Sequence, residues 1–324
     1  MSASPPIRFS VILPVHQGER YLDQALSSIA NQIGFDLSQL ELIAVEDGSS
    51  DRSPELLEKW RHQLPMRILT RKGGSNWMAA TNAGLDTACG DWVCFLHQDD
   101  LWEPRRLQHL WRAITEHPQV DFFCHPVFMI SPDSELLGRW SPAWPAHRPL
   151  TPSEALPRLA IQNTLSIPAP CFRRGLLKKT GPLREDLWFL ADWDLWLRLV
   201  AAAEHSLCLP APLARFRIHP DSQTATRSTH EADLRFQFAE IRKRVEELCG
   251  GKHPRQKAAL VNEDLTLTLA NWSHRQKGVP WRTLWGFLTL GPLRGWTFLR
   301  DTRIFERIVP RLKFKKRPSS EPPC

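Results

Sequence analysis

Short apolar runs that alternate with helical segments constrain this chain of 324 residues more than any other feature. Five of these runs predict buried strands, because they are short, bounded by polar residues or breaks, and rich in β-branched and aromatic residues: 9–13, 42–45, 66–69, 92–96 and 120–124. Segments with helical spacing, such as 22–32 and 76–88, lie between them. Strands that alternate with helices form βαβ units, and right-handed crossovers place the helices on both faces of the sheet. We therefore predict an α/β fold with an open, mostly parallel sheet and flanking helices.

Three of the predicted strands end in clusters of polar residues. Pro14-Val15-His16-Gln17 follows the first strand, Glu46-Asp47-Gly48-Ser49 follows the second, and Gln98-Asp99-Asp100 follows the fourth. In open parallel sheets, ligands bind at the carboxyl ends of the strands, near a change in strand order. The three polar clusters therefore predict a binding site at that edge of the sheet.

Asp99 and Asp100 place two carboxylates side by side at this edge. Mg²⁺ and Mn²⁺ prefer oxygen ligands and are commonly held by one or two carboxylates together with substrate phosphates. The structural alternative is an acidic pair at a helix N-terminus, which the helix dipole favours. Asp47 also has two interpretations. It accepts hydrogen bonds from a nucleotide base that Gly48 allows to approach closely, or it belongs to an ordinary strand-to-helix turn.

Asp192 and Asp194 lie at the start of the amphipathic segment 193–199. Asp192 is a candidate general base for an acceptor hydroxyl, and helix capping is the structural alternative. His219 is either an anion contact, together with nearby arginines, or an ordinary turn histidine. The sequence has no G-x-x-x-x-G-K-[ST] or G-x-G-x-x-G phosphate loop and no G-x-S-x-G elbow, which argues against the enzyme classes that depend on these motifs.

Together, five motifs resemble those of the inverting glycosyltransferases of family 2, which have the GT-A fold. The matching segments, in the family's order and spacing, are SVILPVHQGE (10–19), VEDGSSD (45–51), AATNAGL (79–85), FLHQDD (95–100) and ADWDLWLRL (191–199). The resemblance covers about residues 10–220. It implies a metal-dependent transfer of a sugar from a nucleotide diphosphate donor, UDP- or dTDP-linked, to a hydroxyl of a growing glycan or a lipid-linked saccharide.

The resemblance also implies roles for individual residues. The backbone of Pro14 and Val15 would line the base pocket, and Asp47, preceded by the acidic Glu46, would read the base. Asp192 would be the catalytic base. Asp99 would contact the ribose and the metal, and Asp100 would be the direct ligand of Mn²⁺ or Mg²⁺. His219 would lie near the diphosphate.

Two positions depart from the family pattern. His97 stands where the family often has the first Asp of D-x-D-D, which changes the set of metal ligands. Thr81 replaces a frequent Arg, so one cationic contact to sugar or phosphate is expected to be absent.

Two other classes of protein compete with this interpretation. A nucleotidyltransferase also uses paired carboxylates and Mg²⁺, but it usually carries a Gly-rich basic loop near the first strand, where this chain has residues 14–19 with one Gly. A non-catalytic sugar-nucleotide-binding module would keep Asp47 but need not keep Asp99, Asp100 and Asp192 together.

The charge is divided unevenly along the chain. Residues 1–220 carry 22 Lys and Arg against 24 Asp and Glu, whereas residues 221–324 carry 20 against 11. We predict a catalytic domain at 1–220 and a basic, Trp-containing helical extension at 221–324 that faces an anionic partner.

The extension contains two amphipathic patterns. Residues 298–312 are expected to form one interfacial helix, with Arg300, Arg303, Arg307 and Arg311 on one face and Phe298, Phe305, Ile308, Val309 and Leu312 on the other. Upstream, an apolar stripe consists of Trp281, Leu284, Trp285 and Leu288. Trp suits a membrane interface, so we expect contact with an anionic membrane surface. The alternative is that both stripes pack on the catalytic domain.

Seven scattered cysteines without a CxxC pair indicate neither a zinc cage nor a disulfide framework. The sequence shows no signal peptide pattern and no run of about 20 apolar residues. We expect a cytoplasmic protein, peripheral on the membrane, and no nucleic acid partner, because no recognisable nucleic-acid-binding module is visible.

Overall fold

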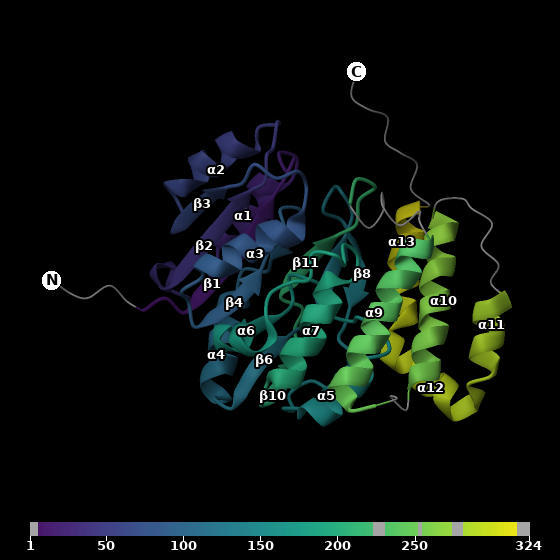
Figure 1. Cartoon of the computed structure of the whole chain (residues 1–324). Helices are drawn as coiled ribbons and strands as arrows, with labels where there is room; N and C mark the ends of the chain where they lie inside the picture. Colours follow the sequence, from purple (N-terminus) through teal and green to yellow (C-terminus); the bar gives the residue numbers. More distant parts are fainter. Residues whose placement is uncertain (1–5, 223–230, 252–254, 274–280, 316–324) are drawn as a thin grey trace, which may run out of the picture.

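A computed structural model describes residues 6–222, 231–251, 255–273 and 281–315 (Figure 1). Its main sheet has seven strands in the order β10-β6-β9-β4-β1-β2-β3. Their bounds are β1 Phe9–Val15, β2 Leu40–Glu46, β3 Met66–Thr70, β4 Trp92–Phe95, β6 Val120–Cys124, β9 Cys171–Arg173 and β10 His205–Cys208. Only β9 runs antiparallel to its neighbours, β4 and β6. The predicted open, mostly parallel sheet is confirmed.

Helices cover both faces of this sheet because its strands alternate in the direction of their side chains. Ile12 of β1 belongs to one buried cluster, while Val11 and Leu13 belong to the other. The first cluster includes α3 (Trp77–Thr87) and α7 (Ala191–Ala202), and the second includes α1 (Leu22–Ala30), α2 (Ser53–Arg61) and α4 (Arg106–Glu116). The core therefore has two layers, one on each side of the sheet.

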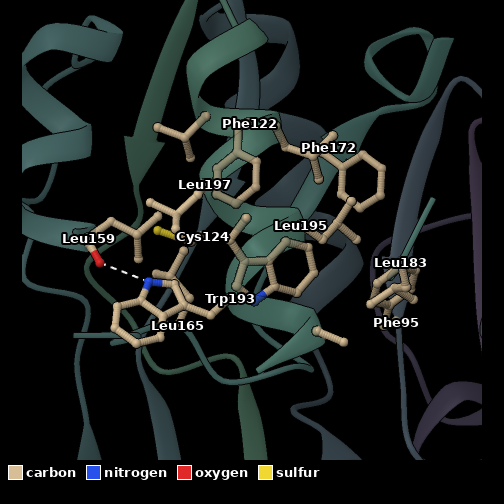
Figure 2. Close-up of a cluster of buried hydrophobic side chains, with 14 of the residues drawn as sticks. Phe95, Phe122, Cys124, Leu159, Leu165, Phe172, Leu183, Trp193, Leu195 and Leu197 are labelled. Atoms are coloured by element: carbon tan, nitrogen blue, oxygen red, sulfur yellow. Dashed lines mark hydrogen bonds between the residues drawn. The ribbon is translucent and has the colours of Figure 1, made fainter. Parts of the chain in front are cut away.

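The layer under α7 is rich in aromatic rings. Phe95, Phe122 and Phe172, from three neighbouring strands, pack against Trp196 with ring centroids 5.6–6.2 Å apart. Figure 2 shows the rings of Phe95, Phe122 and Phe172 together with the indole of Trp193, which donates a hydrogen bond to the Leu159 carbonyl. These contacts fix α7 across β4, β9 and β6.

The first strand is longer than the sequence predicted. Pro14 was expected to end it, but β1 continues to Val15, and Pro14 pairs with Val45. Pairing of β1 with β4 extends only to Ile12 and Phe95, so the missing N–H of Pro14 falls beyond that ladder.

The Pro- and Trp-rich residues 125–185, for which the local pattern predicted irregular structure, form regular elements instead. They contain β7 (Val127–Ile130), β8 (Leu136–Trp140), α5 (Pro152–Leu159), β9, the 3-10 turn η2 (Arg174–Leu176) and α6 (Leu177–Thr180). A second sheet has the order β5-β11-β7-β8, with β5 at Leu101–Trp102 and β11 at Ala214–Arg217. A further 3-10 turn, η1 (Leu37–Gln39), precedes β2. The short strands pair over long distances in the sequence, which local patterns do not reveal.

The described residues after 230 form helices: α9 Glu231–Cys249, α10 Gln256–Ser273, α11 Trp281–Leu288, α12 Gly291–Thr302 and α13 Ile304–Lys315. In Figure 1 they stand side by side beyond α7, with α11 outermost. The predicted domain boundary near residue 220 lies between the last strand and α9.

The single interfacial helix predicted at 298–312 is wrong. Arg303 adopts a left-handed backbone conformation (φ 49°) and separates α12 from α13. Phe298 and Arg307 are buried, and Asp301 is buried between Arg255 and Arg300. Glu306 of α13 accepts with Oε2 from Ser141 N, just after β8, at 2.6 Å, which anchors this helix beside β8. The side chain of Arg311 lies outside the described residues.

Candidate active site

The carboxyl ends of β1, β2 and β4 meet because these three strands are neighbours in the sheet. Gln98 joins two of them directly: its Oε1 accepts from His16 N and its Nε2 donates to His16 O, both at 2.8 Å. Asp47 N donates to Val15 O at 2.8 Å, which ties the end of β2 to β1. The polar clusters that the sequence placed after three separate strands therefore lie at one edge.

Asp47 is buried and has a cation beside it. Its Oδ2 accepts from Asn76 N at 3.0 Å, and its Oδ1 lies 3.2 Å from Arg71 Nη1. Oδ1 and Nη1 both lack a hydrogen-bond partner although both atoms are buried. Buried polar atoms are normally hydrogen-bonded, so an unpartnered acceptor beside an unpartnered donor indicates a place where a ligand completes the bonding.

The turn after Asp47 requires glycine at position 48. Gly48 has φ 74°, and a Cβ there would lie 2.9 Å from Gly73 O. Glu46 stabilises the same turn by accepting from Ser49 N at 2.5 Å, so its carboxylate serves the backbone. Pro14 and Val15 are buried in β1 at this edge.

Asp99 and His219 lie together, although 120 residues separate them in the sequence. His219 Nε2 is 2.9 Å from Asp99 Oδ2. The side chain of Asp99 is 25% exposed, and the pKa of its carboxyl is lowered because the hydrogen bond to His219 and the charges of His97 and His219 outweigh the opposing effect of burial. Nε2 of His97 and Nδ1 of His219 are buried without a partner.

Asp100 has different surroundings. It is 1% exposed, and its Oδ1 accepts from Arg217 N at 2.9 Å. Burial, together with the charge of Asp99, raises the pKa of this carboxyl well above its usual range. Arg217 itself is buried: it donates from Nε to Asp99 O at 2.8 Å and stacks over Tyr21 with 4.4 Å between its Cζ and the ring centroid. Arg217 therefore connects β11 to the end of β4.

These residues fit a divalent cation only in combination with a substrate. Among the residues that the structure describes, no three His, Cys, Asp or Glu side chains are grouped closely enough to bind a metal. Asp99 offers a carboxylate that solvent reaches, and the free ring nitrogens of His97 and His219 are further donors. One or two protein ligands completed by phosphate oxygens is the usual arrangement for Mg²⁺ and related ions.

Asp192 lies in the first turn of α7, and its pKa is raised from 3.8 to about 7 by burial. Two hydrogen bonds to its carboxylate oppose that effect: Trp193 N donates to Oδ1 at 2.7 Å, and Asn163 Nδ2 donates to Oδ2 at 2.9 Å. The side chain remains partly exposed. A carboxyl that titrates near neutral pH can take up a proton from an alcohol and release it to water.

The position of Asp192 is secured from the C-terminal helices. Gln237 of α9 accepts with Oε1 from Phe189 N at 2.9 Å and from Leu190 N at 3.3 Å, just before α7 begins. Gln237 is fully buried. It pairs backbone N–H groups that would otherwise be left without partners beside the start of this helix.

A second connection runs through the loop after α5. Asn163 O accepts from Gln162 Nε2 at 2.8 Å, and Gln162 Oε1 accepts from Asn262 Nδ2 at 2.7 Å. Asn262 Oδ1 then accepts from Arg307 Nη1 at 2.9 Å. We call these four residues the Asn163–Arg307 chain. It links the partner of Asp192 to α10 and α13.

Sequence reasoning did not identify Arg71, Asn163 or Gln237, and it considered Arg217 only as one of the arginines near His219 in an anion contact. Nothing in the sequence marks Arg71, Asn163 and Gln237, because their partners Asp47, Asp192 and Phe189 lie 24, 29 and 48 residues away. The contact of Arg217 with Asp99 spans 118 residues. Thr81 was flagged as a departure, and it is buried in α3, where its hydroxyl donates to Trp77 O at 2.7 Å.

Comparison with known proteins identifies the family. The profile of glycosyl transferase family 2 matches residues 10–173. A PGL/p-HBAD biosynthesis glycosyltransferase of Mycobacterium bovis (strain BCG / Pasteur 1173P2) is 31% identical over 192 residues, which cover 59% of this chain and 68% of that protein.

Solved structures share the fold at lower identity. S. aureus TarS 1-349 in complex with UDP-GlcNAc has a TM-score of 0.61 at 18% identity, covering 97% of this chain and 98% of that one. The mannosyltransferase PcManGT from Pyrobaculum calidifontis, in complex with GDP-Man and Mn²⁺, has a TM-score of 0.57 at 16% identity, covering 96% and 84%. The GT-A fold is thereby confirmed, and neither the nucleotidyltransferase nor the non-catalytic module is supported. The chain belongs to glycosyl transferase family 2 and is a glycosyltransferase.

Proposed function

We propose that this enzyme transfers a sugar from a UDP- or dTDP-linked donor to a hydroxyl of a glycan or lipid-linked saccharide, with inversion at the anomeric carbon. The observation that carries the proposal is Asp192, a partly exposed carboxyl whose pKa is raised to about 7 by burial. An alcohol is a weak nucleophile and needs a base whose pKa lies near the working pH. A single displacement assisted by this base inverts the configuration.

The choice of uracil or thymine as the nucleobase of the donor rests on Asp47 and Arg71. The edge of uracil or thymine offers an N–H between two carbonyl oxygens. Asp47 Oδ1 and Arg71 Nη1 form an ion pair with 3.2 Å between them, but neither atom has a hydrogen-bond partner. This pair complements one N–H and one neighbouring carbonyl of such a base. The backbone of Pro14 and Val15 would line the pocket beside it.

The diphosphate would lie at the end of β4. We propose that Asp99 and Asp100 hold Mn²⁺ or Mg²⁺ there, with Asp99 as the accessible ligand because its carboxylate is more exposed than that of Asp100. When bound, the cation neutralises negative charge on the leaving diphosphate. His219 would orient Asp99 through the 2.9 Å contact of its Nε2 with Oδ2 and would lie near the diphosphate.

Release of the nucleotide diphosphate tests this function. The full chain is incubated with UDP-, dTDP- and GDP-sugars and Mn²⁺, and donor binding is measured by calorimetry alongside turnover. We expect binding of a uridine or thymidine donor that EDTA weakens sharply and that Asp99→Asn weakens in the same way. Asp86→Asn, an exposed carboxyl on α3, serves as the matched control. Undiminished donor binding and transfer in EDTA would contradict the metal role, and preference for a guanosine donor would contradict the proposed uridine or thymidine donor.

A further inference from the structure

Six large apolar side chains of α11 and α12 are exposed. They are Trp281, Leu284, Trp285, Leu288, Leu293 and Trp296, with exposed fractions from 49% for Leu284 to 85% for Leu293. We call this set the apolar α11–α12 surface. It lies at the outer end of the molecule, where α11 is the outermost helix in Figure 1. Monomeric soluble proteins rarely expose so many large apolar side chains together, so a surface of this kind indicates an interaction site.

The inward face of the same helices is already packed. The rings of Phe287 and Phe298 meet edge to face at 5.9 Å, and both belong to a small cluster with Val261 of α10. A Cβ on Gly286 would lie 3.0 Å from Val261 Cγ2, so α11 approaches α10 as closely as a glycine permits. Lys257 Nζ donates to Thr289 O at 2.8 Å. Since α11 already packs one face against the rest of the molecule, the outward side chains form a second, separate surface and are not part of the hydrophobic core.

The charge around this surface has one sign. Residues 281–300 contain three arginines and no acidic residue, and Arg282 and Arg294 are exposed among the apolar side chains. Arg300 is paired with Asp301 at 2.7 Å and contributes less. Trp suits the depth of lipid headgroups, and arginine binds their phosphates. Apolar side chains interleaved with cations are therefore complementary to an anionic bilayer.

We propose that the apolar α11–α12 surface seats this enzyme on an anionic lipid bilayer. The contact is interfacial, because no helix among the described residues combines the length and hydropathy needed to cross a membrane. A second copy of the chain fits less well, since a symmetric interface would bring two surfaces of the same positive charge together. The proposal goes beyond the transfer reaction and does not depend on the identity of the donor or of the catalytic base.

Vesicle sedimentation with the full chain tests this inference. The probes are phosphatidylcholine vesicles with and without phosphatidylglycerol, at low and at high salt. We expect the protein to sediment with the anionic vesicles and to be released by salt. The double variant Trp285→Ser/Trp296→Ser should no longer sediment, and Arg282→Gln/Arg294→Gln should bind at least about tenfold more weakly. Leu136→Ser, which changes an exposed leucine on β8, is the matched control and should bind as the parent does.

Circular dichroism and donor binding show whether each variant is folded. We expect both to be unchanged, because all five substituted residues are exposed and lie away from the candidate active site. Absence of sedimentation at low salt would overturn the proposal, as would equal sedimentation by the Trp285→Ser/Trp296→Ser variant. Light scattering that finds a dimer in the parent and a monomer in that variant would assign the surface to a second copy instead.

Discussion

Asp192 and Asp194 are two residues apart on one helix, yet their surroundings give them opposite chemistry. Asp194 is fully buried and forms ion pairs with Arg198 at 2.7 Å and Arg244 at 2.9 Å. Asp192 faces no cation at such a distance in the described residues, so burial raises its pKa and leaves it able to exchange a proton. Asp194 therefore has a structural role in ion pairs, and a catalytic role is proposed for Asp192.

Replacing Asp192 by Asn should lower the rate of sugar transfer but raise the stability of the fold above neutral pH. We expect turnover to fall by about 10²–10⁴ because the proton acceptor is lost, while donor affinity changes little. The folded pKa of about 7 lies above the ordinary 3.8, so ionisation opposes folding, and this carboxyl costs stability as the pH rises between these values. Asp192→Asn should therefore be relatively more stable above pH 7, and the gain should fade toward pH 4. Thermal unfolding across pH, measured beside initial rates, checks both expectations; full turnover in the variant would assign the base elsewhere.

Asn163 is expected to act as a positioning residue for Asp192. Its Nδ2 donates to the carboxylate and so opposes the rise in pKa. Asn163→Ala should move the acidic limb of the kcat/KM profile, near pH 7 in the parent, to higher pH, and much of the rate should return in alkaline buffer. A rate that falls by the same factor at every pH would show that Asn163 only supports the fold.

At the scale of elements, α7 depends on helices that come later in the chain. Gln237 of α9 binds two backbone N–H groups ahead of α7, and the Asn163–Arg307 chain reaches α10 and α13. Each of these links is buried or largely so. Buried polar groups that lose their hydrogen-bond partners are costly, so these links fix the geometry of α7 and its loop.

Removing Arg307 tests the more distant link. In Arg307→Met, Asn262 Oδ1 loses its donor, and we expect a loss of about 1–3 kcal/mol in the free energy of unfolding. Turnover should fall while donor affinity changes little, because the loop with Asn163 is less well held. Lys243→Met, an exposed change on α9, controls for the loss of charge. Denaturant unfolding and steady-state rates provide the measurement; equal donor and turnover losses in Arg307→Met would indicate general damage rather than a loosened loop.

At the scale of the whole molecule, the sheet and the C-terminal helices share one hydrophobic core. Phe238, Ile241 and Val245 of α9 belong to the same buried cluster as Phe95 and Trp196. The indole of Trp193 and the ring of Phe238 have centroids 6.2 Å apart. Loss of α9 would expose this face of the core and uncover the start of α7.

Truncation tests this shared core. A chain that ends at residue 222 should unfold without a cooperative transition or accumulate as aggregates, because it exposes the apolar residues that α9 covers. A chain that ends at residue 251 retains α9 and should unfold cooperatively at lower temperature than the full chain. Calorimetric scans of both are the measurement. A short chain with a sharp transition equal to that of the full chain would show that residues 1–222 fold independently.

Local patterns predicted the strands that carry the site, and long-range pairing explains what they did not predict. Residues 120–124 are β6 as expected, and Asp47 and Asp99 lie where their strands end. By contrast, β5 and β9 are two and three residues long and exist through their pairing with β11, β4 and β6. The prediction of one amphipathic helix over 298–312 was wrong because the backbone at Arg303 is left-handed and interrupts the helix.

Gln237 and the Asn163–Arg307 chain have a consequence for modular exchange. Helical extensions of sugar-transferring enzymes look like parts that could be swapped to redirect an enzyme to a new surface or acceptor. Here such a graft would also remove side chains that hold α7 in place. Through Asn163, it would change the proton affinity of Asp192 as well. A chimera would bind its donor and reach its new location, but with a reset pH optimum unless Gln237, Asn262 and Arg307 were carried along.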